Sequence, residues 1–243
     1  MRALFKSTTA LTLALALSSL SGCAQAGPAD KAEVEKIVKE YLLENPEIIR
    51  EALVVLQERE DRQSIVNVAK ELKEDPRDFS VGPKDAKITM VEFFDYNCTY
   101  CKSSTKWVQE VMKKHPNDVR IIFKELPILD GRTRTSRNAA KAAMAAQKQG
   151  KYLEMHLALM NSSVLSQDFI TKTAKKLELD MEKFEKDMKD KANDAQLEAA
   201  LVLANRIPGL TGTPFFVINE EYLASGNTRA LQAMLDKALK EAS

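Results

Sequence analysis

The chain contains a Cys-x-x-Cys motif, Cys98-Thr99-Tyr100-Cys101, between a run typical of a β-strand, residues 88–96, and a run typical of a helix, residues 102–114. This order places the two sulfurs one helical turn apart, close enough for a disulfide, with the first cysteine at a helix N-terminus. Unpaired backbone N–H groups and the helix dipole favour a thiolate at that position. Because a thiolate attacks other disulfides, the motif predicts thiol–disulfide exchange.

A cysteine pair can also form a static disulfide or bind zinc. The helix-terminal position argues against a merely static disulfide. Four-coordinate zinc needs two more ligands, and the chain offers only His115, His156 and Cys23 as further soft side chains. We expect His115 at a solvated helix end and His156 packed among helices. The prediction is therefore no metal site, and no cofactor beyond the redox-active disulfide of Cys98 and Cys101.

The first 26 residues are expected to form a secretory signal peptide. Arg2 and Lys6 give a basic start, and residues 10–17 form an apolar stretch too short for a lasting membrane span. Residues 20–23 (LSGC) resemble a bacterial lipobox, in which Cys23 would be lipidated and become the N-terminus. Residues 24–26 (AQA) resemble an ordinary cleavage site, and both alternatives stay open. Export brings the mature protein to a compartment where disulfides persist.

The charge balance bears on the kind of partner. The chain has 243 residues, 36 of them lysine or arginine and 35 aspartate or glutamate, and its net charge is +1. Neither nucleic acid nor an acidic membrane surface is implied as a partner by such a balance. The length suits one globular domain with additional segments.

Two amphipathic helices are predicted before the main domain. Residues 29–43 place apolar side chains on one helical face, and residues 45–47 (NPE) are a helix start signal for a second helix ending near Lys73. Residues 57–64 are all polar, so they are expected to cross solvent or bend. Because an exposed apolar stripe usually marks an interface, residues 27–78 are predicted to form a helical oligomerisation stalk and linker.

The main domain is predicted to cover residues 79–243. Strand-like runs lie at residues 87–94, 119–126, 215–218 and 221–224, and a helical block fills about residues 132–206. The order is strand, Cys-x-x-Cys helix, strand, helical block, two strands and a final helix. This order predicts an α/β, thioredoxin-like fold with an inserted helical domain, preceded by the N-terminal helical oligomerisation segment.

Three segments of this domain carry a family resemblance. Residues 91–101 (VEFFDYNCTYC), 123–127 (FKELP) and 212–217 (GTPFFV) resemble the DsbA-type bacterial disulfide oxidoreductases. The resemblance covers about residues 84–243. Residues 41–61 resemble the extra N-terminal segment of ScsC-like isomerases and of related outer-membrane proteins of intracellular pathogens.

Glu92 and Lys124 are candidate site residues on the two predicted central strands. An acid within the apolar run KITMVEFF is unexpected in a buried strand. Alternation places Glu92 on the face opposite Phe93, and the resemblance implies a buried proton acceptor for Cys101. A solvent-facing glutamate on an edge strand is the alternative. Lys124 is a candidate charge partner of Glu92, with a surface lysine as the alternative.

Thr213-Pro214 opens the third apolar strand, where proline forfeits a ladder hydrogen bond. The resemblance implies a cis peptide beside the cysteines, which leaves the backbone of Thr213 free to pair with a substrate strand. A plain strand-entry proline is the alternative. Cys98 is the expected nucleophile, and Cys101 is the resolving thiol that releases the substrate.

Thr99-Tyr100 stands where strongly oxidising DsbA enzymes have Pro-His, so a milder oxidant is expected. Tyr100 and Thr213 resemble the corresponding residues of the isomerases DsbC and DsbG. The predicted function is formation and isomerisation of disulfides in unfolded or misfolded cysteine-containing exported proteins. The alternatives are a monomer-like dithiol oxidase with a spacer segment and a non-enzymatic, envelope-anchored structural protein.

The resemblance also implies partners and a location. A membrane redox partner of the DsbB or DsbD type would reset the cysteine pair. The protein is expected in the periplasm of a Gram-negative bacterium, anchored by lipid to the outer membrane if Cys23 is lipidated. It is expected to be a homo-oligomer, with a dimer favoured over a trimer.

Overall fold

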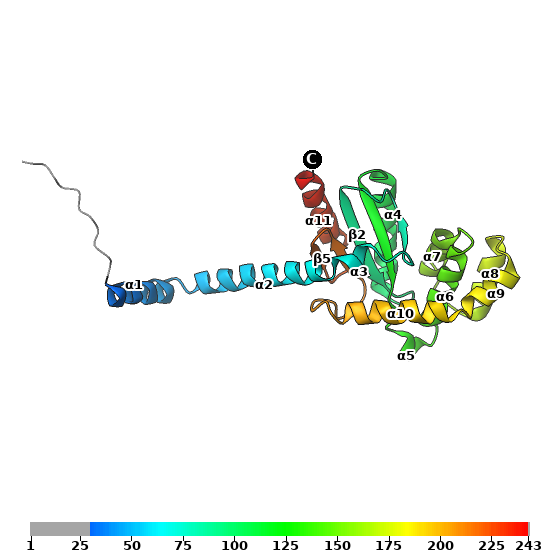
Figure 1. The fold of residues 1–243 in the computed structure, drawn as a ribbon, viewed down its shortest axis with the longest axis horizontal. Helices are drawn as coiled ribbons and strands as arrows, with labels where there is room; N and C mark the ends of the chain where they lie inside the picture. Colours follow the sequence, from blue (N-terminus) through cyan, green and yellow to red (C-terminus); the bar gives the residue numbers. More distant parts are fainter. Residues whose placement is uncertain (1–29, 243) are drawn as a thin grey trace, which may run out of the picture. The chain divides into compact units, whose positions relative to one another are not determined.

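The computed structural model describes residues 30–242, drawn as a ribbon in Figure 1. The predicted signal peptide and Cys23 lie outside the described residues. The chain divides into two compact units, one ending at Ala52 and the other beginning at Leu53. Among the described residues, no helix is both long and apolar enough to cross a membrane.

The first unit contains helix α1 (Lys31–Glu44) and the first part of α2 (Glu47–Asn67). The side chain and the backbone N–H of Asn45 both donate to the carbonyl of Tyr41 at 2.9 Å, so this residue closes α1 at the predicted break. No residue of α1 is buried. Its large apolar side chains are all more than two-fifths exposed apart from one leucine: Val34, Ile37, Val38, Tyr41 and Leu43.

The second unit begins within α2. The polar residues 57–64 continue this helix without a break and are mostly exposed, so of the two expectations they cross solvent and do not bend. The helix ends at Asn67 and is followed by α3 (Ala69–Lys73). Ile65, Val68 and Leu72 are at most 2% exposed and join the core of this unit. The C-terminal end of the predicted stalk therefore packs with the main domain. The sequence instead predicts the boundary between stalk and main domain after residue 78.

A five-stranded mixed sheet organises the second unit, in the order β1-β3-β2-β4-β5. Strand β2 (Ile88–Phe94) is central, parallel to β3 (Val119–Glu125) and antiparallel to β4 (Phe215–Ile218). The outer strands are β1 (Phe79–Val81) and β5 (Glu221–Leu223). The side chains of β2 alternate between two separate cores, one on each face of the sheet.

One face of the sheet packs against helices α4 (Thr99–Lys114) and α11 (Thr228–Glu241) and against the part of the helical insertion that precedes residue 191. The other face packs against Ile65, Val68 and Leu72 and against helix α10 (Lys191–Ala204). We call these the active face and the opposite face. Each apolar core lies between the sheet and one helical layer.

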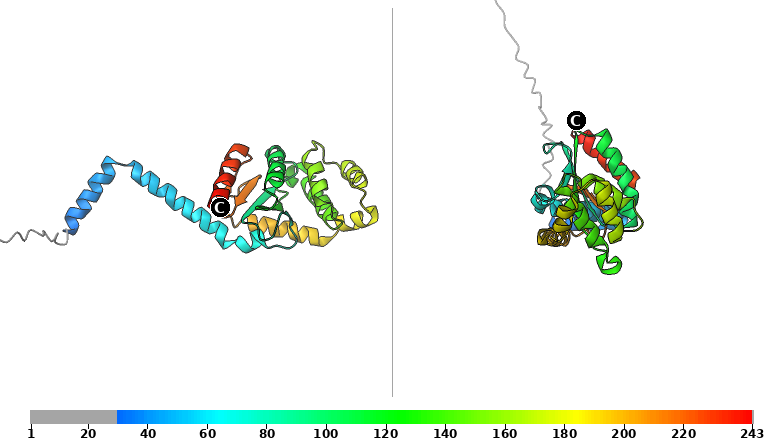
Figure 2. Two further views of the ribbon diagram at one scale, coloured as in Figure 1. Left: turned by 90° about the horizontal axis from the view of Figure 1, so that it is seen from above. Right: turned by 90° about the vertical axis from the view of Figure 1, so that its right-hand side faces the viewer.

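The predicted thioredoxin-like fold is confirmed. The insertion predicted between β3 and β4 is also present, and it is helical. Its helices are α5 (Asp130–Thr133), α6 (Ser136–Gln147), α7 (Tyr152–Met160), α8 (Gln167–Lys176), α9 (Met181–Met188) and α10. Helix α6 buries six alanines, whose small side chains allow close helix packing. Figures 1 and 2 show α8 and α9 at the end of the second unit that is distant from α11.

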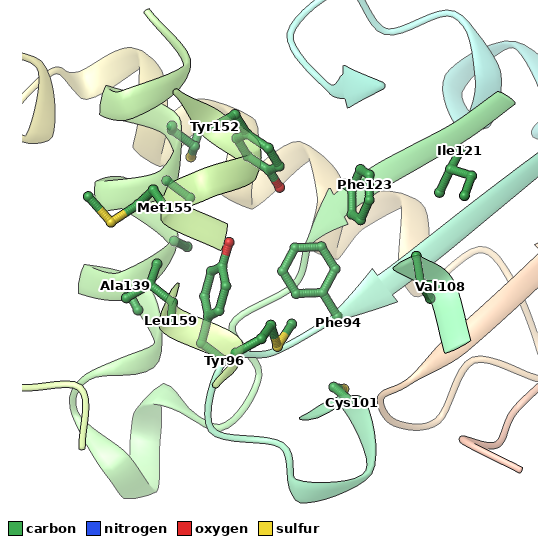
Figure 3. Close-up of a cluster of buried hydrophobic side chains, with 14 of the residues drawn as sticks. Phe94, Tyr96, Cys101, Val108, Ile121, Phe123, Ala139, Tyr152, Met155 and Leu159 are labelled. Atoms are coloured by element: carbon green, nitrogen blue, oxygen red, sulfur yellow. The ribbon is translucent and has the colours of Figure 1, made fainter. Parts of the chain in front are cut away.

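Aromatic side chains join the insertion to the sheet. Figure 3 shows Phe94 of β2 among Tyr96, Phe123 and Tyr152, with Cys101 at the edge of the same cluster. The rings of Phe94 and Tyr96 meet edge to face, with their centroids 5.2 Å apart. The start of α4, which carries Cys101, is thus packed directly against the aromatic core of the active face.

Candidate active site

Cys98 is the N-cap residue of α4, as the sequence predicts. Its backbone N–H donates to the carbonyl of Asp95 at 3.0 Å, which closes a turn between β2 and the helix. Its sulfur accepts the N–H of Cys101 at 3.4 Å and lies 3.1 Å from the carbonyl oxygen of Thr213. Cys98 is 6% exposed and Cys101 is fully buried, and both are free thiols. The structure therefore brings the two cysteines and Thr213 into direct contact.

The two thiols differ in acidity. Hydrogen bonds from the Cys101 thiol, Thr213 and the N–H groups of Cys101 and Tyr100 outweigh burial and lower the pKa of Cys98 to about 6. Burial raises the pKa of Cys101 far above its usual range. At pH 7 about nine-tenths of Cys98 is therefore thiolate while Cys101 keeps its proton. This asymmetry suits one sulfur to attack and the other to resolve.

The peptide bond between Thr213 and Pro214 is cis, as the resemblance implies. It lies immediately before β4 and beside Cys98. A pocket of about 210 Å³ next to it is lined by Thr213, Pro214, Tyr100 and Gly226, among others. A Cβ atom at Gly226 would lie 2.9 Å from the carbonyl oxygen of Tyr100, so this close approach requires glycine. Tyr100 itself is 70% exposed at the mouth of the site.

Glu92 lies at the middle of the central strand and is 1% exposed. The alternative of an edge strand facing solvent is thereby excluded. Its Oε1 atom has no hydrogen-bond partner among the described residues. Burial, with a smaller contribution from the charge of Cys98, raises the pKa of Glu92 to about 8. A buried carboxyl group that changes protonation near neutral pH and interacts with the thiols can accept or return a proton.

Lys124 does not pair with Glu92, so this prediction was wrong. In the register of β2 and β3, Lys124 lies opposite Phe93, whereas Glu92 lies opposite Phe123. The two side chains therefore point to different faces of the sheet. Lys124 is buried on the opposite face, where it forms an ion pair with Asp78 and donates to the carbonyl of Glu71 at 2.6 Å.

Two buried acids near the cysteines were not identified from the sequence. Asp95 follows β2 and is 1% exposed, and Glu125 ends β3 and is 4% exposed. Both lie at the carboxyl ends of two parallel neighbouring strands, which is the edge where active sites of such sheets gather. Their place at the ends of two predicted strands could have identified both acids as candidate site residues from the sequence.

Glu125 is the centre of a buried hydrogen-bond network. Its Oε1 atom accepts the hydroxyl groups of Tyr96 at 2.9 Å and Tyr152 at 2.8 Å. The hydroxyl of Tyr96 also lies 3.1 Å from Nδ1 of His156. Burial raises the pKa of Glu125 to about 8 and lowers that of His156 to about 3. His156 is therefore a neutral, packed side chain, as the sequence indicates.

Within residues 30–242, no three histidine, cysteine, aspartate or glutamate side chains gather in an arrangement that could hold a metal ion. The predicted site residues that the structure does bring together are Cys98, Cys101, Thr213, Pro214 and Tyr100. Glu92 interacts electrostatically with both thiols.

Comparison with known proteins gives two family matches. Residues 74–237 match the thioredoxin family, and residues 30–63 match the N-terminal domain of the copper resistance protein ScsC. The first match covers most of the second unit. The second covers α1 and most of α2, the segment for which the sequence predicted an oligomerisation role.

Solved structures agree with these matches. A thioredoxin-like oxidoreductase from Silicibacter pomeroyi DSS-3 is 35% identical, with a TM-score of 0.64, and the match covers 70% of this chain and 97% of that one. A linker-deletion and N6K mutant of Proteus mirabilis ScsC is 26% identical, with a TM-score of 0.66, and the match covers 90% of this chain and 99% of that one.

The curated relatives are much longer proteins. The Na(+)/H(+) antiporter NhaA 3 of Salinispora tropica is 33% identical over 168 residues, which cover 68% of this chain and 25% of that protein. The chain thus spans about a quarter of the length of the curated relatives that it matches.

Proposed function

This chain belongs to the thioredoxin family, in its DsbA-like, ScsC-type branch, and we propose that it forms and isomerises disulfides in exported proteins by exchange through Cys98 and Cys101. The observation that carries the proposal is the state of Cys98. Its sulfur lies at a helix N-terminus against Thr213 and has a pKa of about 6. No cofactor beyond the cysteine pair is needed for this chemistry.

In isomerisation the Cys98 thiolate attacks a substrate disulfide and forms a mixed disulfide. The released substrate thiolate then attacks another disulfide of the substrate, and a final attack on the mixed disulfide returns Cys98 as thiolate. No net electrons move in this cycle. If the substrate stalls, Cys101 attacks the Cys98 sulfur, releases the substrate as a dithiol, and passes its proton to Glu92.

In oxidation the flow is reversed. A substrate thiolate attacks Cys98 in the Cys98–Cys101 disulfide, and Cys101 leaves and takes a proton from Glu92. A second substrate thiolate then attacks the substrate sulfur of the mixed disulfide and releases Cys98 as thiolate, so the substrate gains a disulfide and passes two electrons to the protein. A membrane redox partner of the DsbB or DsbD type would remove those electrons or supply them.

Isomerisation is favoured over pure oxidation by two features. Thr99-Tyr100 places no imidazolium beside Cys98 to stabilise the thiolate further, so the reduced form is stabilised only moderately. The exposed apolar side chains of α1 suit self-association. Joining several active sites on one substrate raises their effective concentration, which assists repeated rearrangement of the same chain.

The exchange proposal is tested by refolding of scrambled ribonuclease with the mature protein and its Cys98→Ser variant. We expect the variant to lose activity to the level of the uncatalysed reaction, because a serine hydroxyl cannot form the mixed disulfide. A Cys98→Ser variant with wild-type activity would refute the proposed nucleophile. A titration of the Cys98 thiolate by its ultraviolet absorbance checks its pKa independently.

The oligomer is tested in the full mature chain with the double variant Ile37→Asp/Tyr41→Asp, which places charges on the exposed stripe of α1. Light scattering should report a smaller mass, and isomerase activity should fall while dithiol oxidation continues. Lys39→Asp, also on α1 and exposed, is the matched control. A wild-type protein that is monomeric would favour a dithiol oxidase with a spacer segment.

We also propose export to the periplasm. Mass spectrometry of the mature N-terminus distinguishes a lipidated Cys23, which would anchor the protein to the outer membrane, from free cleavage after Ala26. A mature chain that retains residues 1–22 would contradict both forms of processing.

A further inference from the structure

The turn that carries Cys98 is tied to the start of the helical insertion by a buried carboxylate. The Oδ1 atom of Asp95 accepts the backbone N–H of Asn97 at 2.7 Å and the hydroxyl of Ser136 at 2.7 Å. Its Oδ2 atom accepts the backbone N–H of Leu129 at 2.9 Å. One donor therefore lies in the cysteine turn itself, and the other two lie in the segment that leads from β3 into the insertion.

Asn97 ties the same two segments together a second time. Its side-chain amide donates to the hydroxyl oxygens of Thr133, Thr135 and Ser136 at 3.2, 2.9 and 2.8 Å. Ser136 is fully buried and contacts both Asp95 and Asn97. The segments 95–97 and 129–136 thus form one connected polar network, and its buried members have their hydrogen bonds made.

This network fixes where the turn sits. The carbonyl of Asp95 accepts the N–H of Cys98, while its side chain holds the backbone of Asn97. The sulfur of Cys98 accepts the Cys101 N–H, and a hydrogen bond from the side chain of Thr213 also lowers the pKa of Cys98. Because hydrogen bonds weaken steeply with distance and angle, a small shift of the turn weakens the contacts that stabilise the thiolate.

The charges around Asp95 do not by themselves explain its place. The ammonium of Lys102, one turn into α4, interacts favourably with it, whereas Asp130 interacts unfavourably. Burial is the largest effect and raises the pKa of Asp95. Burial of an acid is costly by itself, and the three hydrogen bonds that Asp95 accepts offset part of that cost. These hydrogen bonds are what a positioning role would use.

We propose that Asp95 is a positioning residue for Cys98, and that Ser136 and Asn97 make the helical insertion a part of that positioning. The proposal rests on the proposed function only in taking Cys98 as the reacting sulfur. In this proposal the insertion affects the reactivity of Cys98, because residues 129–136 hold the turn at residues 95–98 in place.

Ser136→Ala tests this without changing charge. It removes one of the three donors to Asp95 and one acceptor of Asn97. We expect the pKa of the Cys98 thiol to rise by about one unit, the worth of roughly one net hydrogen bond. The alkylation rate by iodoacetamide at about pH 6 should fall about fivefold, as the thiolate fraction drops from about a half to about a tenth.

Ser166→Ala is the matched control. Ser166 caps α8, also in the insertion, and its hydroxyl accepts the N–H of Phe169 at 3.1 Å. This variant should lower stability without altering the Cys98 titration. If Ser136→Ala does not fold, Asn97→Ala removes three bonds of the same network at a less buried position and should shift the pKa in the same direction.

Asp95→Asn separates positioning from charge. In Asp95→Asn the amide N–H groups face a group that is itself a donor, so the turn should loosen and the pKa of Cys98 should rise. If Asp95 acted only through its negative charge, the pKa of Cys98 would fall instead. A lowered pKa, or an unchanged pKa in all folded variants, overturns the proposal. If the wild-type Cys98 itself titrates like a free cysteine, the proposed function fails instead, so the two failures are distinguishable.

Discussion

The two faces of the sheet bury charge in different ways. The active face buries two carboxyl groups, Glu92 and Glu125, and no ion pair joins either of them to a cation among the described residues. The opposite face buries Lys124 with Asp78 as an ion pair, and the two side chains are 3% and 5% exposed. The same sheet thus buries acids without a cation on one side and an acid paired with a lysine on the other.

This difference distinguishes buried groups that can transfer protons from buried groups that hold segments together. A buried acid without a cation stays neutral up to a raised pKa, and it can therefore take up or release a proton near neutral pH. In the buried ion pair, burial raises the pKa of Asp78 and the ammonium of Lys124 offsets part of that effect, so the pair is suited to holding segments together. The two acids of the active face also differ from each other. Oε1 of Glu125 accepts from two tyrosines, whereas Oε1 of Glu92 has no partner within residues 30–242.

The largest expected effect comes from breaking the pair on the opposite face. Lys124→Met leaves Asp78 buried without its partner and should lower the free energy of unfolding by about 3–5 kcal/mol. Urea unfolding followed by the fluorescence of Trp107, the one tryptophan of the chain, measures this. The exchange rate of the folded protein should not change.

The double variant Lys124→Met/Asp78→Leu is the control for that experiment. It replaces both charges with apolar side chains and should recover most of the lost stability. A double variant as unstable as Lys124→Met would mean that the pair is not the reason for the loss.

The next effect distinguishes the two acids of the active face. Glu92→Gln removes the group that takes the proton of Cys101, and it should slow the resolving step about 100-fold at about pH 7, within the usual range for a general base. Glu125→Gln keeps an acceptor for both tyrosines and is buried in the same core, so it is the matched control and should leave the rate unchanged. Rapid-mixing measurements of mixed-disulfide resolution give both rates, and equal rates in the two variants would refute the distinction.

The pH dependence of stability should treat the two acids alike. Each has a folded pKa of about 8 and ionises in the unfolded chain near its ordinary, lower pKa. Between these values the folded state binds more protons, so stability is full at low pH and falls as pH rises, by at most about 1.4 kcal/mol per pH unit for each group.

Either glutamine variant should therefore flatten this decline relative to wild type. The lowered pKa of Cys98 makes an opposing contribution, by which stability rises above about pH 6. This contribution cancels when Glu125→Gln is compared with wild type at the same pH. In Glu92→Gln the pKa of Cys98 is titrated as well, because the charges of Glu92 and Cys98 interact. A variant whose stability changes with pH as steeply as wild type would mean that its acid is ionised in the folded protein.

The smallest effect concerns the donors of Glu125. Tyr152→Phe removes the bond that joins α7 of the insertion to β3 and should cost about 1 kcal/mol of stability. Tyr41→Phe, on the exposed surface of α1, is the control and should be neutral in the same denaturant experiment. A neutral Tyr152→Phe would show that Tyr96 alone satisfies Glu125.

Much of the site could be predicted because its signals are local. The helix-terminal position of Cys98 follows from a strand and a helix that adjoin it in sequence, and the face of Glu92 follows from alternation along one strand. Lys124 was assigned to the wrong partner because alternation shows which residues of β3 share a face with each other. It does not show which residues of β2 lie on that same face. The register against β2, which brings Lys124 beside Phe93, depends on pairing between segments about thirty residues apart.

Other elements needed distant contacts as well. The polar run 57–64 has the composition of a solvent-crossing connector, yet it continues α2 and leads into Ile65 and Leu72, which pack on the sheet. Asp95 resembles any acid in a turn until Leu129 and Ser136 are placed against it. Nothing within a few residues of either segment identifies these partners.

The sequence by itself determined the chemistry, the order of the elements and the insertion, because the Cys-x-x-Cys motif and hydrophobic periodicity act over one or two turns of chain. The tertiary structure decided which buried charges are paired, where the main domain begins, and how the turn of Cys98 is held. Those outcomes depend on register and on packing between segments far apart in the chain. A buried charge is identified as functional or structural only by what that packing places beside it.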